Sequence, residues 1–419
     1  MARKGIREYD AKRILSKALS AYAGEVALVG PETKTKDLLK EKPWLGKKRL
    51  VVKPDQLFGK RGKHGLIAVD KSWAEATKWI EERMNKEVEV GEIKGTLSHF
   101  LVEPFVPHEA EYYVAMRVGP EGDTINLSKA GGVNVEECWD QVGSLSVPVA
   151  TFLTRTAVDV EVAKHFDKED QELIGDFMMK LYEVFVKGQF SYLEINPFTI
   201  VDGKVLPLDA VAKLDDTAEF ECQEVWGNLE FPIPFGRSFS PEEAFVNDLD
   251  SKTGASLKLS VLNPKGNIWT MVAGGGASVI YADTISDLGF CEEMANYGEY
   301  SGNPNAETTY QYAKTILDLM TREKDPKGRA KYLLIGGGIA NFTDVAKTFG
   351  GIIRALEEYA EKLKEVGVEV FVRRGGPNYK VGLERMRALG EKTGVPVKVF
   401  GPEAHITKIV SDALAKERN

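Results

Sequence analysis

Residues Ser191–Asp215, which read SYLEINPFTIVDGKVLPLDAVAKLD, decide how the first half of the chain folds. An apolar run ends at Pro197. Asp202-Gly203 then follows as a strong hairpin signal, with β-prone residues on either side. The pattern therefore predicts a strand, a tight turn and a return strand, and in such a hairpin Asn196 and Asp209 lie side by side.

An amide oxygen and a carboxylate on neighbouring strands suit Mg²⁺, because this ion accepts few protein ligands and keeps waters and nucleotide phosphates. Asn196 and Asp209 are therefore candidate metal ligands. The alternative interpretation is an ordinary hairpin with a capped turn, since Asp-Gly hairpins are common. Spacing alone favours the ordinary hairpin, so the rest of the chain has to decide between the two.

Length and composition indicate a protein of two or three globular domains. The chain has 419 residues and a net charge of -8, which argues against a general nucleic-acid binder. No apolar run approaches the roughly 20 residues that a membrane span needs, and no apolar segment typical of a signal peptide follows the first basic residues. The three cysteines, Cys138, Cys222 and Cys291, are few and far apart. This usage predicts a reducing, cytoplasmic location without a disulfide framework.

A basic, glycine-rich loop follows an early strand. The predicted strand Arg49–Gln56 contains Lys53, and the loop Phe58–Gly65 reads FGKRGKHG. Glycines let backbone N–H groups turn toward a phosphate, and the interleaved cations add charge. When the loop is taken by itself, a basic solvated turn is the favoured interpretation, because a glycine-rich basic loop alone is a weak signal. Further on, the apolar stretch Phe100–Pro107 carries two prolines, which predicts a strand at a sheet edge or a hinge.

The second half alternates strands and amphipathic helices, which predicts a doubly wound parallel α/β domain. A segment rich in proline and aromatic residues, Trp226–Arg237, separates it from the first half. We therefore expect domains at residues 1–240 and 241–419. The predicted strands are Ile268–Val272, Tyr332–Ile335, Val368–Val372 and Val397–Phe400, and the clearest helices are Glu307–Arg322, Val345–Lys364 and Tyr379–Thr393.

Three of these strands run into glycine-rich loops. The loops are Ala273–Ser278, Gly336–Thr343 and Arg373–Asn378, and a further loop is expected at Asn296–Pro304. Ligands of such sheets bind beyond the carboxyl ends of the strands. Close backbone approach, helix N-termini and the Arg373-Arg374 pair together favour an anion site. Glycines that only tighten the turns would explain one loop but not all three.

These motifs resemble those of a known family. YLEINP followed by LDAVAKLD is similar to the metal-binding end of an ATP-grasp domain, as found in ATP-citrate lyase and its relative, the succinyl-CoA synthetase β subunit. The stretch from Leu257 to Thr284, together with GEYSGNP, IANFT and FVRRGGPNY, resembles the citrate-handling domain of ATP-citrate lyase. The resemblance runs from about Leu50 to Ala413. It implies an ATP-grasp domain followed by a flavodoxin-like CoA-ligase domain.

The resemblance also implies roles for individual residues. In the first half, the nucleotide phosphates would contact Lys53, Arg61 and Gly62. Glu103, Phe105 and Val106 would form the adenine slot, Glu111 would hold the ribose, and Asn196 and Asp209 would bind Mg²⁺. In the second half, citrate would contact Ser301, Gly302, Asn341, Thr343 and Arg374, and Arg374 would also serve catalysis. Two departures weaken single contacts: Ala130 stands where relatives carry an acid, and Gly338 where animal relatives carry a serine.

What the chain lacks points to a partner. None of the five histidines (His64, His99, His108, His165 and His405) lies in a loop resembling the family's phosphorylated one. The resemblance therefore implies one subunit of a hetero-oligomer that uses ATP, Mg²⁺, citrate and CoA. The partner would resemble the succinyl-CoA synthetase α subunit, fused to a citrate-synthase-like domain, and would carry the phosphohistidine and most of the CoA site.

Three alternatives stay open at this point. A citryl-CoA synthetase subunit would differ only in having its product cleaved by a separate enzyme. A succinyl-CoA synthetase β subunit is disfavoured by RRGGPNY and IANFT. A regulatory subunit that binds citrate without turnover is disfavoured by the intact set Lys53, Glu111, Asn196 and Asp209.

Overall fold

The computed structural model describes residues 3–19, 25–132 and 139–418. By its internal contacts the chain divides into an N-terminal unit, Met1–Ser238, and a C-terminal unit, Phe239–Asn419. Each unit has its own sheets and cores and is described by itself. No helix in the described parts of the chain is both long and apolar enough to cross a bilayer.

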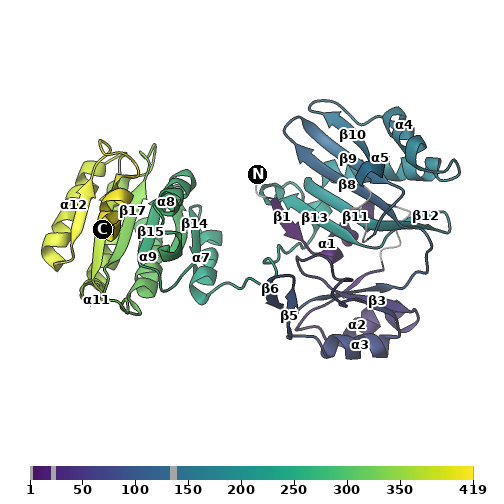
Figure 1. Cartoon of the computed structure of the whole chain (residues 1–419), viewed down its shortest axis with the longest axis horizontal. Coiled ribbons are helices and arrows are strands. Elements are labelled where there is room, and N and C mark those ends of the chain that lie inside the picture. The colour runs from purple at the N-terminus through teal and green to yellow at the C-terminus, as the bar shows by residue number, and fades with distance from the viewer. Residues whose placement is uncertain (1–2, 20–24, 133–138, 419) are drawn as a thin grey trace. The chain divides into compact units, whose positions relative to one another are not determined.

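The larger sheet of the N-terminal unit is antiparallel and contains the predicted hairpin (Figure 1). β11 (Phe190–Val201) and β12 (Lys204–Pro207) pair across Asp202-Gly203, and both turn residues have positive φ, 50° and 67°. β13 (Ala210–Asp215) then returns along the first half of β11. The order is β1-β13-β11-β8-β9-β10, with β12 on β11, and the remaining strands are β1 (Arg3–Ile6), β8 (Tyr112–Gly119), β9 (Gly122–Ser128) and β10 (Gly143–Pro148).

Helices α1 (Glu8–Ala18), α4 (Arg155–His165) and α5 (Gln171–Lys187) belong to this sheet's apolar core. Apolar residues at helical spacing predict helices over Tyr9–Ala23 and Gln171–Lys187. α5 has the predicted bounds, and α1 runs from Glu8 to Ala18; the predicted end of the first helix, at residues 20–24, lies outside the described residues. The short helix α6 (Gln223–Trp226) closes the unit and buries Trp226.

A second sheet of the same unit carries the early strand and its lysine. Its order is β2-β7-β3-β4, with β2 (Ala27–Val29), β7 (Phe100–Pro104), β3 (Leu50–Pro54) and β4 (Ala68–Lys71), and its core includes residues of α2 (Thr35–Glu41) and α3 (Trp73–Glu81). The expectation that Phe100–Pro107 forms an edge strand is wrong, because β7 lies between β2 and β3. Pro104 is tolerated there because it ends the strand. β5 (Glu87–Val90) and β6 (Ile93–Thr96) form a separate pair.

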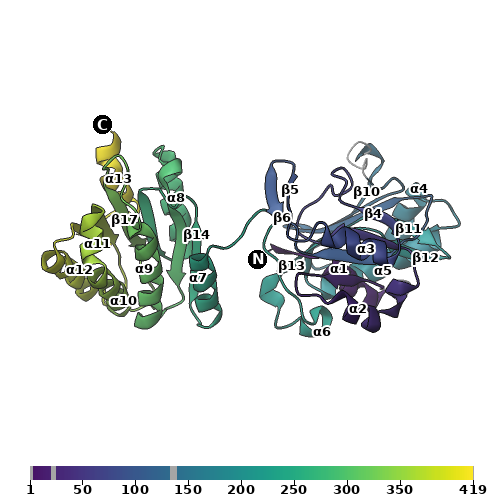
Figure 2. The same ribbon diagram turned by 90° about the horizontal axis from the view of Figure 1, so that it is seen from below.

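The C-terminal unit is the doubly wound sheet that the strand–helix alternation predicts. Its order is β14-β16-β15-β17-β18-β19, and all neighbours are parallel except β14 and β16. Alternate residues of β15 face two cores: Trp269 and Met271 belong to one, Ile268 and Val272 to the other. Figures 1 and 2 show α9, α10 and α12 on the first face and α8 and α13 on the second.

The bounds of these elements agree with most of the predicted ones. The strands are β14 (Ser256–Val261), β15 (Ile268–Ala273), β16 (Asn296–Ser301), β17 (Lys331–Gly337), β18 (Val368–Arg373) and β19 (Val397–Phe400), and the helices are α7 (Pro241–Ser251), α8 (Gly275–Asp287), α9 (Ala306–Thr321), α10 (Val345–Glu358), α11 (Ala360–Glu365), α12 (Tyr379–Thr393) and α13 (Lys408–Leu414).

Two expectations are corrected here. The helix expected over Val345–Lys364 is interrupted at Tyr359 and forms α10 and α11. The loop expected from Asn296 is a strand as far as Ser301, because its residues alternate between buried and half-buried positions although asparagine, glycine and serine are common in loops.

Candidate functional site

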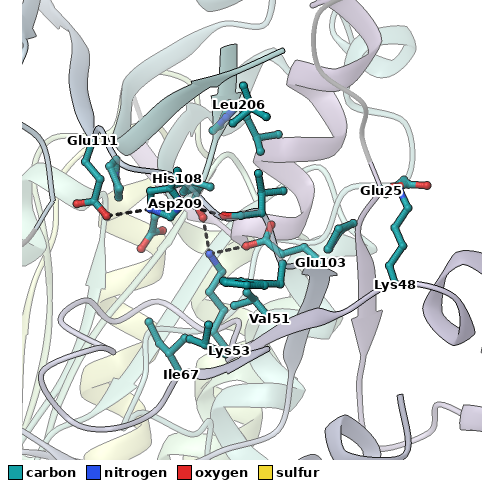
Figure 3. Close-up of a pocket in the computed structure, with 18 of the residues that line it drawn as sticks. Glu25, Lys48, Val51, Lys53, Ile67, Glu103, His108, Glu111, Leu206 and Asp209 are labelled. Carbon is teal, nitrogen blue, oxygen red and sulfur yellow. Dashed lines mark hydrogen bonds and ion pairs between the residues drawn. The ribbon is translucent and has the colours of Figure 1, made fainter. Parts of the chain in front are cut away.

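A pocket of about 550 Å³ lies in the N-terminal unit, between residues of its two sheets (Figure 3). Six of the predicted nucleotide and metal residues line it: Lys53, Glu103, Phe105, Val106, Glu111 and Asp209. β3 supplies Lys53 and β7 supplies Glu103, so these side chains meet because the two strands are hydrogen-bonded neighbours. Apolar atoms of Val51, Ile67 and Leu206 add flat surface, as a pocket for a nucleobase needs.

Lys53 is buried and surrounded by oxygen atoms. Its Nζ lies 2.7 Å from Glu8 Oε1 and 2.9 Å from Glu103 Oε1, and it donates a 2.6 Å hydrogen bond to the Leu208 carbonyl. Figure 3 shows this ammonium group pointing at Glu103. Glu8 belongs to α1, so three separate segments meet at one ammonium group.

Arg61 is buried beside this lysine and links the loop to the hairpin. Its Nη2 lies 2.7 Å from Glu8 Oε2 and donates a 2.5 Å hydrogen bond to Asp209 Oδ1, while Nη1 donates to the Pro54 carbonyl. Arg61 and Gly62 are not among the residues that line the pocket. Arg61 therefore acts on the pocket through Asp209 in this structure.

Burial and charge work against each other in this network. Burial alone would raise the pKa of Glu8, but Lys12, Lys53 and Arg61 outweigh it and hold that pKa well below its usual range. Asp55 accepts hydrogen bonds from the backbone N–H groups of Glu8 and Tyr9. Burial, and then repulsion by Glu8, raise the pKa of Asp55 to about 6.

The two candidate metal ligands are neighbours, as the hairpin predicts. The Asn196 N–H donates a 3.2 Å hydrogen bond to the Asp209 carbonyl, so both side chains start from adjacent backbone. Asn196 Oδ1 accepts from the Gly132 N–H at 2.7 Å, and Asp209 accepts from Arg61. In the described part of the chain no three His, Cys, Asp or Glu residues form a metal cluster. An amide and a carboxylate oxygen fit Mg²⁺ that is held mainly by phosphates and waters.

Glu111 lies at the pocket with a partner that the sequence did not single out. His108 Nε2 is 3.2 Å from Glu111 Oε1, and His108 Nδ1 is 2.8 Å from the Val106 carbonyl. The Glu111 carbonyl accepts from the Gly131 N–H. Ala130 hydrogen-bonds through its N–H to Ser128 Oγ, and the residues from Val133 to Cys138 lie outside the described parts.

The second group of predicted residues gathers at the carboxyl ends of the strands of the C-terminal unit. Ser301 ends β16, Gly302 follows with a φ of 73°, and Asn341 and Thr343 follow β17. A backbone hydrogen bond of 2.9 Å from Ala340 to Gly375 ties the loop after β17 to the loop after β18. A Cβ at Gly338 would meet no atom within 4 Å, so a serine would fit there.

The two arginines after β18 differ in what holds them. Arg373 donates to the carbonyls of Gly337, Pro402 and Ala404. Arg374, only 6% exposed, donates through Nη1 to the Gly338 carbonyl at 2.7 Å, and no ion pair of the described residues includes it. Arg374 is thus a buried cation without a carboxylate partner in the described chain.

Two buried tyrosines near Arg374 were missed by the sequence reasoning. Tyr300 and Tyr281 are at most 2% exposed. Burial lowers the pKa of Arg374, and the two tyrosines oppose that shift. The Tyr300 hydroxyl makes no hydrogen bond within the described chain. Burial raises the pKa of Tyr300 to about 12, against the attraction of Arg374. The GEYSGNP letters contain Tyr300, but only the fold shows that it is buried beside Arg374.

Comparisons with known proteins cover both units. The family description "ATP-citrate synthase ATP-grasp domain" matches residues 2–226, and "ATP citrate lyase citrate-binding" matches residues 237–416. The chain is 52% identical to the ATP-citrate synthase alpha chain protein 2 of Oryza sativa subsp. japonica, over 99% of this chain and 98% of that one. It is 48% identical to the ATP-citrate synthase of Mus musculus, over 99% of this chain but 38% of that protein.

A solved structure matches as well. The chain superimposes on the ATP citrate lyase of Methanothrix soehngenii, whose structure was solved with citrate and coenzyme A, with a TM-score of 0.86, 53% identity, and coverage of 99% of this chain and 100% of that one. Both predicted folds, the ATP-grasp domain and the CoA-ligase type domain after it, are confirmed by these matches.

Proposed function

We propose that this chain is the ATP- and citrate-binding subunit of a split enzyme. It belongs to the ATP-citrate lyase family, an enzyme family that consumes ATP. A plant alpha chain has nearly this length, whereas the mouse protein extends far beyond the matched part. Because that plant relative is named an alpha chain, we assign the remaining functions to a separate partner subunit. We assign residues 1–240 to nucleotide binding and residues 241–419 to citrate binding.

The pocket between β3, β7 and the hairpin is the observation that carries this proposal. It holds Lys53 for the phosphates, with Arg61 and Gly62 in the loop beside it, Glu103, Phe105 and Val106 for the adenine ring, and Glu111 for the ribose hydroxyls. A pocket of about 550 Å³ lies within the range usual for small-molecule sites.

Asn196 and Asp209 are the residues that would hold Mg²⁺. When bound, the ion would neutralise phosphate charge and polarise the terminal phosphoryl group. To bind it, Asp209 would exchange its Arg61 hydrogen bond for the metal, which frees Arg61 for a phosphate.

The C-terminal unit would hold citrate at the ends of its strands. Arg374 would pair with one carboxylate through two parallel hydrogen bonds, and Ser301, Gly302, Asn341 and Thr343 would surround the rest. Arg374 would also stabilise charge on the carboxylate that reacts. The buried, unpaired guanidinium supports this assignment, because buried charges in proteins are normally compensated.

The reaction would proceed in four steps shared with the partner, three group transfers and one bond cleavage. The terminal phosphoryl group leaves ATP for a histidine of the partner, and ADP is released. That phosphoryl group then passes to a citrate carboxylate and gives citryl phosphate. The thiol of CoA attacks the acyl carbon and displaces inorganic phosphate. Cleavage of a carbon–carbon bond in citryl-CoA yields acetyl-CoA and oxaloacetate.

The partner we infer resembles the succinyl-CoA synthetase α subunit and carries the histidine, most of the CoA site and a citrate-synthase-like module. If it lacks that module, the complex is a citryl-CoA synthetase and its product is citryl-CoA. The sparse cysteines, of which Cys222 is buried and Cys291 exposed, both as free thiols, support a cytoplasmic location.

Purified chain and partner test the proposal together. The chain alone is expected to bind Mg·ATP and citrate in calorimetric titrations but to form no acyl-CoA. Adding the partner should yield acetyl-CoA and oxaloacetate, or citryl-CoA, in an ATP- and citrate-dependent way. Acyl-CoA from rigorously purified single chain, or succinyl-CoA from the complex in preference to a citrate product, would contradict the split-enzyme proposal.

A further inference from the structure

Lys12 of α1 is a fully buried cation behind the nucleotide pocket. Its exposed fraction is 0%, and it is not among the residues that line the pocket. Its Nζ lies 2.6 Å from Glu103 Oε2 and 2.7 Å from Glu8 Oε1, and it donates a 2.8 Å hydrogen bond to the Leu208 carbonyl. A cation is buried in this way only where its charge is compensated.

Lys12 and Lys53 share the same three partners. Lys53 meets Glu8 and Glu103 at 2.7 and 2.9 Å and the Leu208 carbonyl at 2.6 Å. Lys53 borders the pocket and Lys12 does not. One ammonium group can therefore turn toward a ligand, while the other can only stay with the carboxylates.

A lysine that contacts phosphate has to leave some of these oxygens. If Lys53 left with no other cation present, Glu103 would remain half-buried and unpaired, which is strongly unfavourable. After Lys53 leaves, Glu103 still has Lys12 at 2.6 Å, and Glu8 still has Lys12 and Arg61, each at 2.7 Å. Each carboxylate thus keeps Lys12 as a direct cationic partner, even if Arg61 turns to a phosphate.

We propose that Lys12 is a positioning residue, a fixed counter-ion that keeps Glu8 and Glu103 compensated so that Lys53 is released to the phosphates of the nucleotide. The inference rests on the proposed function, because it requires a nucleotide in the pocket. Burial would lower the pKa of Lys12, but Glu103 and Glu8 raise it above its usual value, so the side chain stays charged. Lys12 itself touches no substrate.

Lys12→Met tests this, because methionine fills similar space without charge. In calorimetric titrations of the full-length chain, the Kd for Mg·ATP is expected to rise about tenfold, the effect of one charge-assisted hydrogen bond. Two variants on the same helix serve as controls. Lys17→Met removes an exposed lysine, and Ile14→Ala destabilises the buried face without a charge change. Both should bind Mg·ATP within about twofold of wild type, as distant changes do.

A second substitution, which removes a carboxylate paired with Lys12, distinguishes charge compensation by Lys12 from a purely structural role in the helix. Glu103→Gln combined with Lys12→Met removes the carboxylate that would depend on Lys12 after Lys53 leaves, together with Lys12 itself, so it should bind Mg·ATP within about threefold of Glu103→Gln alone. If Lys12→Met does not fold, this comparison of the double variant with Glu103→Gln alone still decides the matter, because the two should bind alike.

The outcomes are distinguishable from failure of the proposed function. If wild-type chain binds no Mg·ATP, the proposed function itself is wrong. If wild-type chain binds it and Lys12→Met binds equally well, only the role of Lys12 is wrong. A double variant Lys12→Met, Glu103→Gln that binds much more weakly than Glu103→Gln alone, or an equal loss in Ile14→Ala, would also overturn the inference, because either would make Lys12 a structural residue only.

Discussion

The two candidate sites of this chain differ in whether their buried cations have carboxylate partners. In the N-terminal unit the buried cations Lys53 and Arg61 each have two carboxylates within ion-pair distance. In the C-terminal unit, the Arg374 guanidinium is nearly as buried, but among the described residues it hydrogen-bonds only to a backbone carbonyl, and the nearby Tyr300 hydroxyl hydrogen-bonds to none of them.

This difference indicates two modes of ligand binding. Under the proposed function, binding at the nucleotide pocket would be an exchange, in which phosphates and metal would replace internal partners of Lys53, Arg61 and Asp209. At the strand ends of the C-terminal unit it would be an addition, in which a ligand carboxylate would supply the counter-charge that Arg374 lacks within the described chain. Variants in the first site should therefore disturb the free chain as well as the complex, and variants in the second mainly the complex.

We expect the largest effect from removing the candidate metal ligands at the nucleotide pocket. Asp209→Asn and Asn196→Ala each remove a charge or an oxygen ligand, so ATP-dependent phosphorylation of the partner should fall about 10²–10³-fold. Citrate binding by the same variants should be unchanged, because Asp209 and Asn196 belong to the other unit. Rapid-quench phosphorylation assays measure the first and calorimetry the second. Wild-type phosphorylation rates in both variants would refute the metal assignment.

A smaller effect is expected at Arg374, where a ligand carboxylate would add a partner to the guanidinium without replacing one. Arg374→Lys keeps the charge but loses the planar fork, so the Kd for citrate should rise about tenfold, the value of one charge-assisted hydrogen bond. Phosphorylation of the partner from ATP should persist, while citrate-dependent dephosphorylation slows. Arg373→Lys is the matched control, since Arg373 is held by three backbone carbonyls. Loss of phosphorylation with citrate binding intact would place citrate elsewhere.

The sequence predicted the elements that carry local patterns and missed those that depend on distant contacts. The Asp-Gly hairpin and the strand–helix alternation are set within short windows, so β11, β12 and α12 were predictable. The ion pair between Glu8 and Lys53 is tertiary and joins α1 to β3, whereas the ion pair between Glu8 and Lys12 lies within α1. The only local signal was Lys12 on the same helix face as Leu15, four residues after Glu8.

The buried charges beside the nucleotide pocket should also make the free energy of unfolding depend on pH. The pKa of Asp55 is about 6 in the folded chain, against about 3.9 when unfolded. The folded state thus binds the extra proton between these values. The stabilising contribution is full below pH 4 and is lost as the pH rises through 6, by about 3 kcal/mol over the whole range. Urea unfolding of wild type between pH 5 and 7 should show this fall, and Asp55→Asn should flatten it. Parallel curves for the two proteins would contradict it.

The smallest expected effects concern the neighbouring tyrosines Tyr300 and Tyr312, whose hydroxyl groups differ in hydrogen bonding. Tyr300 and Tyr312 are both buried, with ring centroids 6.0 Å apart, but only the Tyr312 hydroxyl has a partner, the Lys258 carbonyl at 2.9 Å. Tyr312→Phe should lower the free energy of unfolding by about 1 kcal/mol and leave citrate binding unchanged, because it removes a satisfied hydrogen bond.

Tyr300→Phe removes an unsatisfied hydroxyl, so the free chain should keep or gain stability. If that hydroxyl adds a hydrogen bond to the carboxylate at Arg374, the Kd for citrate should rise about threefold to tenfold. Thermal unfolding with and without citrate measures both quantities. A loss of stability in Tyr300→Phe with unchanged citrate affinity would mean that this site, too, is internally compensated, and the contrast between the two units would fail.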